Sequence, residues 1–326
     1  MRRLLVGLTA LALIAALAAT SFAQTTVGDY EDAFDDFSSE VAKALPFNST
    51  LGLNWSDSYI GKFPHAGVGL MGGFTTIPYD AFKPVADALN VDTGSFGKFE
   101  TWGAPIPAIA VEGRIGGFVL PFDVGLKVGF IPEGTKALLP EDLTADYLLL
   151  GFDVRYRLTE GRGALPEIMV GGGYNYMKAN VTMIGAIPIS QTLTYGAESV
   201  TISDADVAFD VSASAIDLKA QASKKILIIT PYLGLGATLG IGKTSAVASG
   251  TVTPSSPTAI AAIEAATGLD ITNQEVKVEA EGLKGWGFRL YGGTSFNLWV
   301  LKIDVTGMYN FTSKSLGASL GGRIQF

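Results

Sequence analysis

Hydrophobic residues alternate with polar or small residues along much of this chain. In residues 122–130, Phe, Val, Leu, Val and Phe are separated by Asp, Gly, Lys and Gly. The same period of two runs through residues 152–159 and 301–311. A period of two places successive side chains on opposite faces of a β-strand. These segments therefore predict strands with one apolar face and one charged or small face.

The alternation predicts ten strands, near residues 65–76, 105–116, 120–131, 146–159, 166–179, 206–222, 226–242, 284–296, 299–311 and 314–326. Strands of ten residues or more have the length that a tilted strand needs to cross a bilayer. Aromatic residues gather toward the strand ends, as they do at membrane interfaces. A soluble β-sandwich also alternates, but its strands average about five to six residues. The pattern favours an all-β fold, a transmembrane antiparallel up-and-down β-barrel of about 10–12 strands with a short N-terminal helix.

The connections between these strands alternate between short and long. In outer-membrane barrels short turns lie in the periplasm and long loops lie outside, which places residues 77–104, 132–145, 180–205 and 243–283 on the outside. Helices are predicted from Asp80 to Leu89 and from Ser256 to Thr267, and residues 273–283 predict a strand that continues beyond the membrane. Residues 48–56 are an eleventh candidate strand. Because an odd count is unusual, either this segment lies in the lumen or the long stretches contain a further strand.

The chain begins with the features of a secretory signal peptide at residues 1–23. Two arginines follow Met1, an apolar run covers 4–19, and small residues stand at 21 and 23 before Gln24. The run is shorter than the ~20 apolar residues needed to span a bilayer. The sequence therefore predicts export with cleavage after Ala23.

Residues 24–47 precede the predicted barrel, which occupies residues 48–326. Phe34, Phe37, Val41 and Leu45 recur at a spacing of three or four, which predicts an amphipathic helix with an acidic start. One interpretation is a plug inside the lumen. The other is a helix that caps the periplasmic mouth or lies loose. A ten-stranded barrel is narrow, so a helix inside it would largely block the lumen.

Composition and charge exclude several classes of function. The 23 basic and 31 acidic residues give a net charge of −8, which argues against a nucleic-acid partner. Without cysteine there is no disulfide framework, thiolate metal site or cysteine nucleophile. The mean hydropathy of +0.33 is high for a soluble protein, although after Gln24 no run of 18 apolar residues occurs. The partner is expected to be lipid, and no cofactor or metal is expected.

Charged residues fall on the polar phase of the predicted strands, which would face the lumen. They are Glu112, Arg114, Asp123, Lys127, Asp153, Arg155, Arg157, Arg289, Lys302, Asp304 and Arg323. One interpretation is a constriction that selects solutes by charge. The other is a network of ion pairs that fills a closed barrel, which the presence of both signs, seven basic and four acidic residues, favours. Arg155 and Arg157 are the best candidates for an anion-facing patch.

The chain resembles a bacterial outer-membrane β-barrel, and its last residues carry the likeness. Leu316, Ala318, Leu320, Gly322 and Ile324 form the outward phase of a final strand that ends on Phe326. Such an ending resembles the signal that the barrel-assembly machinery recognises. The resemblance implies location in the cell outer membrane and assembly through the C-terminal strand. It indicates no particular family and brings no catalytic motif.

Two further features invite a chemical interpretation. Gly67, Gly69 and Gly72 match the G-x-G-x-x-G pattern, but they lie in an alternating segment of an exported chain without the strand-to-helix context of a dinucleotide site. They are interpreted as small lumen-side residues that leave space in a small barrel. His65 is the only histidine, and it stands at the periplasmic start of a strand. It is interpreted as a surface or mouth residue rather than a catalytic one.

The sequence predicts a non-enzymatic barrel that passes or binds small molecules, with an N-terminal plug. Apolar loop segments and a plug-like start make hydrophobic solutes conceivable. The alternative is a structural or adhesive barrel that does not conduct and presents long external loops. An enzyme that uses His65 is a third hypothesis.

Overall fold

The computed structural model describes residues 36, 39–41, 43–81, 83, 103–131, 143–267 and 275–326. The expected signal peptide at 1–23, the expected plug residues Phe34 and Phe37, and most of the helix expected from Asp80 to Leu89 lie outside these ranges. Among the described residues, no helix is both long and apolar enough to cross a membrane.

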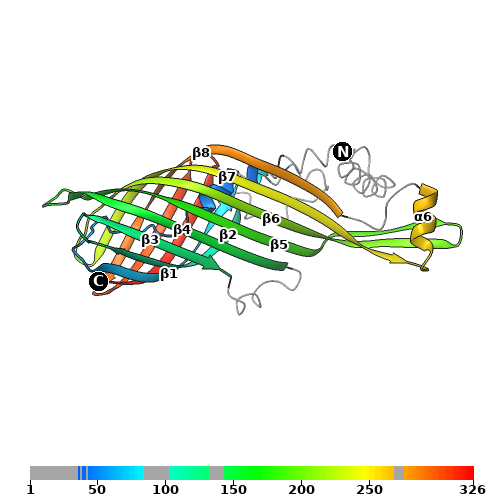
Figure 1. Ribbon diagram of the computed structural model, residues 1–326, viewed down its shortest axis with the longest axis horizontal. Coiled ribbons are helices and arrows are strands. Elements are labelled where there is room, and N and C mark those ends of the chain that lie inside the picture. Colours follow the sequence, from blue (N-terminus) through cyan, green and yellow to red (C-terminus); the bar gives the residue numbers. More distant parts are fainter. Residues whose placement is uncertain are drawn as a thin grey trace.

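Ten antiparallel strands form one closed barrel, as the alternation predicted (Figure 1). They are β1 (His65–Ile77), β2 (Ala104–Gly116), β3 (Phe122–Phe130), β4 (Leu143–Glu160), β5 (Glu167–Tyr195), β6 (Glu198–Ser223), β7 (Ile229–Pro254), β8 (Glu275–Leu298), β9 (Leu301–Asn310) and β10 (Ser315–Gln325). Each strand pairs with its neighbours in sequence, and β1 pairs with β10 to close the ring. The expected all-β transmembrane barrel is confirmed, and its ten strands lie within the expected 10–12.

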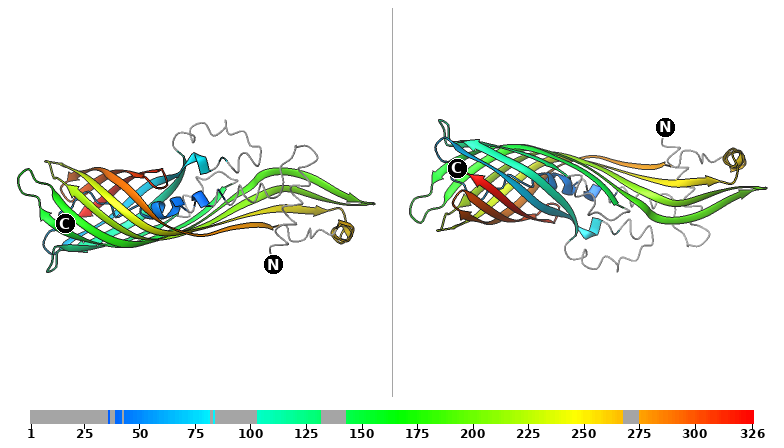
Figure 2. Two further views of the ribbon diagram at one scale, coloured as in Figure 1. Left: turned by 90° about the horizontal axis from the view of Figure 1, so that it is seen from above. Right: turned by 90° about the horizontal axis from the view of Figure 1, so that it is seen from below.

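The two ends of the barrel differ. At one end the strands are joined by short turns, and the C-terminus lies there (Figure 1). Here the backbone amide of Phe326 donates to the Ala66 carbonyl and the amide of Ala66 donates to the Phe326 carbonyl. We call this the short-turn end. At the other end β5, β6, β7 and β8 continue well past their neighbours, and we call it the extended end (Figures 1 and 2).

Residues 180–205 and 243–254 are not the long external loops that the sequence predicted, whereas the strand expected at 273–283 is present from Glu275 as the start of β8. Residues 180–195 continue β5, and residues 198–205 continue β6 back from a turn at 196–197. The ladder between β5 and β6 runs to Tyr195↔Glu198, whereas β4 begins at Leu143↔Met183. Thr, Ser, Ala and Gly make up ten of the 24 residues in these two stretches and interrupt the apolar residues at irregular intervals, so the apolar alternation of the membrane band is weak there. A strand outside lipid has no need of that alternation, which explains the error.

The helix expected at 256–267 is present as α6 (Ala259–Thr267). It lies at the far tip of the extension (Figure 2), where Ala259 and Ile263 pack against Val200. Glu198 accepts hydrogen bonds from the hydroxyls of Ser256 and Thr258 just before the helix. A 3-10 turn, η1 (Tyr79–Ala81), follows β1.

The outer face of the wall is apolar and the inner face is not. Leu70, Leu126, Leu218, Leu235 and Leu320 are each at least half exposed, and all lie on the outward phase of their strands. The residues between them on the same strands point into the barrel. This is how a transmembrane barrel divides its strands between lipid and lumen.

The outward phase yields a prediction about depth in the membrane. Leu126 lies at the middle of the short strand β3 and is 61% exposed, whereas Val119 lies in a turn at the short-turn end and is 95% exposed. We expect Leu126→Arg to lower the free energy of unfolding by about 2–4 kcal/mol and Val119→Arg by at most about 1 kcal/mol. Urea unfolding in lipid vesicles measures both. Equal losses would contradict the membrane placement of β3.

Candidate functional site in the barrel lumen

The inside of the barrel is occupied by the chain that precedes β1. We call residues 43–60 the luminal segment: residues 43–49 are helical, and the rest run without regular structure toward β1. Within residues 44–60 only Pro46 and Tyr59 are not buried. The segment is the blue ribbon enclosed by the strands in Figures 1 and 2. Residues 48–56, the eleventh candidate strand, therefore lie in the lumen rather than in the wall.

The helical part of the luminal segment lies in an apolar section of the lumen. Leu45 and Phe47 of the segment, with Val41 just before it, belong to one buried cluster with Leu149 and Met177 of the wall. Small wall residues provide the room: Ala108, Ala110, Ala179 and Ala213 are buried around the same cluster. Apolar burial is favourable at roughly 25 cal/mol per Å², so this contact stabilises a helix inside the barrel.

Gly240 on β7 shows how closely the helix approaches the wall. A Cβ added at Gly240 would lie 2.3 Å from the Cβ of Pro46. Any larger side chain there needs space that the luminal segment already fills. At this position the space beside an inward glycine is filled by the chain itself.

The extended part of the luminal segment lies among charged wall residues. Glu112 on β2 accepts hydrogen bonds from the Leu53 amide and the Trp55 indole, both at 2.7 Å. Lys127 on β3 donates to the carbonyl of Ser49 at 2.7 Å and also to the carbonyl of Leu51. These side chains pair with backbone that has no strand partner, as buried backbone groups require.

Further wall residues hold the same backbone from other sides. The Leu53 carbonyl accepts from Arg114 at 3.2 Å and from Lys219 at 3.0 Å. Gln221 on β6 donates to the carbonyls of Trp55 and Ser56 at 3.0 and 2.9 Å. Because these partners come from β2 and β6, the segment is bonded to both sides of the barrel.

Asp57 is the acidic residue at the centre of the short-turn end. Its carboxylate accepts from Arg323 at 2.9 Å, from Gln325 at 2.7 Å and from Lys302 at 3.3 Å. Its backbone carbonyl accepts from Arg155 at 2.9 Å. One residue of the luminal segment is thus bonded to β4, β9 and β10.

The wall charges also pair with one another. Arg114 contacts Asp123 at 2.6 Å and Asp153 at 2.8 Å. Arg155 contacts Asp123 at 2.6 Å, and its two nitrogens take both carboxylate oxygens. Lys219 contacts Asp153 at 2.6 Å, so one chain of ion pairs joins β2, β3, β4 and β6. A buried charge is tolerated only when it is paired in this way.

Two more buried ion pairs occur among the described residues of the lumen. Arg289 on β8 contacts Asp217 on β6 at 2.5 Å, and it also donates to the Thr238 hydroxyl at 2.9 Å. Arg323 pairs with Asp304 as well as with Asp57. These pairs lie on the side of the lumen formed by β6–β10.

Nine of the eleven predicted lumen charges are buried: Glu112, Arg114, Asp123, Lys127, Asp153, Arg155, Arg289, Asp304 and Arg323. Arg157 and Lys302 are partly exposed. Arg155 and Arg157, proposed from the sequence as an anion-facing patch, donate instead to protein groups. Arg155 donates to the Asp123 carboxylate and to the Asp57 backbone carbonyl. Arg157 donates to the Ile60 carbonyl at 2.6 Å.

Several residues of this site were missed from the sequence. Asp217, Lys219 and Gln221 alternate with apolar neighbours on β6, so the pattern that found the other charges also points to these three. Asp57 lies outside any strand and has no such pattern. Its one signal is that it is the only acidic residue between Glu40 and Asp80.

His65 is buried at the short-turn end rather than on the surface. Its Nε2 lies 3.4 Å from the amide nitrogen of Gln325, and its ring lies edge-on to Tyr59 with centroids 6.3 Å apart. In the described part of the chain, neither a serine nor a carboxylate forms a hydrogen bond with it. No group of three or more potential metal-ligating side chains occurs among the described residues.

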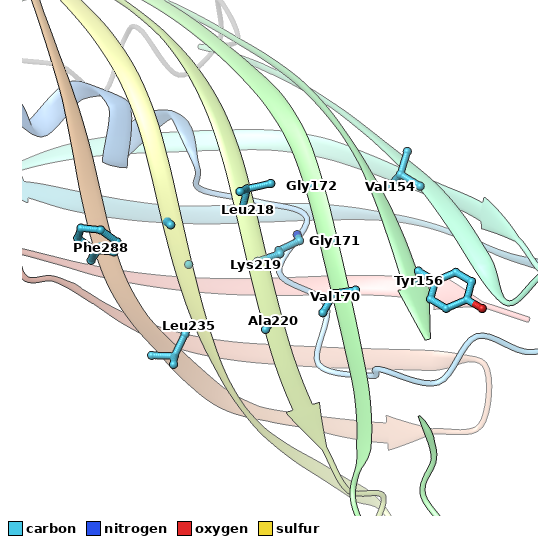
Figure 3. A pocket seen from close by; sticks show the side chains of 12 residues that line it. Val154, Tyr156, Val170, Gly171, Gly172, Leu218, Lys219, Ala220, Leu235 and Phe288 are labelled. Atoms are coloured by element: carbon cyan, nitrogen blue, oxygen red, sulfur yellow. The ribbon is translucent and has the colours of Figure 1, made fainter. Parts of the chain in front are cut away.

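A hollow in the wall lies on the outer face of β4–β8, outside the lumen. Its lining includes Val154, Leu218, Leu235 and Phe288, with small residues such as Gly172 between them. Figure 3 shows these apolar side chains around the hollow. The hollow therefore belongs to the apolar outer face, on the opposite side of the ring from the β1–β10 pairing.

Sequence comparison relates the chain to a group of proteins. Residues 90–326 match the profile of DUF6588, a family of unknown function. The chain belongs to this family. The matched residues include β2–β10, whereas the luminal segment and β1 precede them. No curated protein matches the chain.

Solved structures of similar architecture are distant from this DUF6588 member. The translocator domain of the autotransporter NalP from Neisseria meningitidis has 10% identity and a TM-score of 0.34, over 90% of this chain and 97% of that one. A major outer membrane protein from Thermus thermophilus has 13% identity and a TM-score of 0.32, over 80% and 99%. Omp33 from Acinetobacter baumannii has 7% identity and a TM-score of 0.25, over 81% and 98%. None of these likenesses is close enough to bear on function.

The closed ring and its apolar outer face establish the architecture without them. By architecture the chain is an outer-membrane β-barrel, as expected from its sequence.

The buried ion pairs lead to a prediction about stability. Arg289→Met leaves the buried Asp217 carboxylate without its cation, so we expect a loss of about 3–5 kcal/mol in the free energy of unfolding. The matched control is Arg162→Met, which removes an 88% exposed partner of Glu160 and is expected to cost at most about 1 kcal/mol. Urea unfolding in vesicles compares the two. Similar losses would show that the lumen side chains are hydrated rather than buried.

Proposed function

We propose that this protein is an outer-membrane barrel that passes or binds small molecules, and that the luminal segment is its plug. The observation that supports the proposal is the segment itself, which is buried along the lumen and bonded to β2, β3, β4, β6, β9 and β10. A barrel that only needed a filled interior could use larger side chains, as eight-stranded barrels do. This ten-stranded barrel instead has small wall residues around the helical part of the luminal segment. Around the extended part of the segment, the wall provides hydrogen-bond donors.

The division of the lumen indicates the kind of solute. The apolar section around Leu45, Phe47, Leu149 and Met177 lies toward the extended end, which we place outside the cell. Once the helix leaves, that section offers an apolar site to a solute that arrives from outside. The charged section of the lumen lies between the apolar section and the short-turn end, and it binds the extended part of the luminal segment. The site thus favours hydrophobic or amphiphilic molecules, and no part of the proposal uses catalysis.

Single-channel conductance in planar bilayers tests the plug. The mature protein without residues 24–47 lacks most of the helix that fills the apolar section, so we expect larger or more frequent openings than in the full mature chain. A point variant gives the same test in an intact chain. Gly240→Leu collides with Pro46, and we expect it to raise the open fraction at least tenfold.

Gly322→Leu is the matched control. Gly322 is on the outward phase of β10, and a Cβ there meets nothing within 4 Å. This variant is expected to conduct like the unchanged protein. If the deletion and Gly240→Leu are both silent while the barrel is folded, the aqueous route is rejected.

A cross-link gives a complementary prediction, because the natural chain has no cysteine. Asn48 on the luminal segment donates to the Thr75 hydroxyl on β1 at 2.5 Å, so cysteines at these two positions lie within reach of a short bis-methanethiosulfonate reagent, whose bonds to the two sulfurs a reductant cleaves. We expect the cross-linked Asn48→Cys/Thr75→Cys variant to abolish the openings caused by Gly240→Leu, and a reductant to restore them. Each single cysteine variant is the control. Openings that persist in the cross-linked protein would contradict a movable plug.

The alternative function is a scaffold that presents the extension formed by β5–β8 and α6. The length of these strands beyond the membrane band favours it. Silence of every conductance variant in a folded barrel would support this alternative over transport.

A further inference from the structure

The pairing between β1 and β10 is the place where the barrel closes on itself. Nine residue pairs join the two strands, from Gly67↔Gln325 to Thr75↔Gly317. We call this pairing the seam. The other strand pairs are continuous in the chain through a connection, whereas the seam joins its first strand to its last.

The seam is rich in glycine. Seven of the 18 residues in its nine pairs are glycine: Gly67, Gly69, Gly72, Gly73, Gly317, Gly321 and Gly322. Glycine contributes no cross-strand side-chain contact and loses the most backbone entropy on folding. Gly67 and Gly69 face the lumen as the sequence suggested, whereas Gly72 is on the outward phase of β1, with Leu70 and Phe74.

The luminal segment contacts both strands at the short-turn end of the seam. A Cβ at Gly67 would lie 2.9 Å from the Trp55 ring, and Gly67 faces Gln325 in the first pair of the ladder. The Arg323 guanidinium lies 4.6 Å from the centroid of the same ring. The Asp57 carboxylate binds Arg323 and Gln325 on β10. Trp55 thus touches β1 while Asp57 holds β10.

The luminal segment also contacts both strands at the opposite end of the seam, where Thr75 pairs with Gly317. Asn48 donates to Thr75 on β1. A Cβ at Gly317 on β10 would lie 3.4 Å from the Phe47 ring. Thr75 and Gly317 face each other in the last pair of the ladder. The luminal segment therefore touches both partners of the first pair and both partners of the last.

We infer that the luminal segment is a staple that holds the seam closed, and that its departure opens the wall between β1 and β10 as well as the lumen. This rests on the proposed function, in which the segment leaves. An opening at the seam connects the lumen sideways to the bilayer, which is a route for an apolar solute. The side chains at its two ends replace the cross-strand contacts that the glycines do not make.

Hydrogen–deuterium exchange of the refolded chain in vesicles tests the staple. Asp57→Asn removes the charge that pairs with Arg323 and Lys302. We expect backbone amides of residues 67–75 and 317–325 to exchange at least tenfold faster in this variant, while amides of the β5–β6 ladder on the opposite wall keep their rates. Arg289→Met is the matched control, since it also breaks a buried ion pair but one within the wall. At exchange times too short for global unfolding, it should leave the rates of the seam amides unchanged.

A second variant separates a looser seam from a misfolded barrel. Val68 and Ile324 face each other on the outward phase of the seam. Ala66 and Phe326 exchange two hydrogen bonds two residues further on, so the pair at 68 and 324 has the ~5.5 Å Cα separation of a hydrogen-bonded pair, which suits a disulfide. Added to Asp57→Asn, the oxidised Val68→Cys/Ile324→Cys pair should restore slow exchange at the seam.

The outcomes distinguish the staple from the plug. Seam amides that exchange as slowly in Asp57→Asn as in the unchanged protein overturn the staple, whatever the conductance shows. Equal acceleration in Arg289→Met, or acceleration of the β5–β6 ladder, also overturns it, because the effect is then general loss of stability. Fast exchange confined to the seam supports the staple even if no variant conducts, in which case the plug fails alone.

Discussion

A charge enclosed by a ring of ten strands has to find an opposite charge or a hydrogen-bonding group inside that ring. The alternation of each strand gives the outer face to lipid, so polar residues of the wall have only the lumen to occupy. Ionised side chains in such surroundings are costly unless paired. The chain meets this requirement in two ways: Arg114, Asp123, Asp153 and Arg155 pair across the wall, while Glu112 and Lys127 use the backbone of the luminal segment.

The same constraint explains why the segment changes its structure along the lumen. Where the wall presents alanine and glycine, the segment is helical and satisfies its own backbone. Where the wall presents Glu112, Lys127, Lys219 and Gln221, the segment gives up regular structure, and its amide and carbonyl groups bond to those side chains. The backbone conformation of the luminal segment therefore depends on whether the wall side chains around it are small and apolar or polar.

The fold was largely predictable from the sequence because its signal is local. A period of two within ten residues determines both a strand and its lipid face, and the C-terminal strand ending on Phe326 fits the same pattern. The sequence predicts loops where β5, β6 and β7 continue outside the membrane, because a strand outside lipid has no need of a regular apolar period. The extension of β8 keeps that period at residues 275–280, and there the strand was predictable. Asp57 was missed for a different reason: its partners Lys302, Arg323 and Gln325 lie some 250 residues away in sequence, and no local pattern encodes such a contact.

The position of the luminal segment has a consequence for the order of assembly. The segment is made before every strand of the barrel, yet it ends up enclosed by all of them. Pairing of β1 with β10 joins the parts of the barrel that are furthest apart in sequence, and it is the pairing that closes the ring. Chain that must lie within a ring is most simply placed while the ring is open. The simplest order of assembly therefore has the luminal segment in place among the strands before β1 and β10 pair.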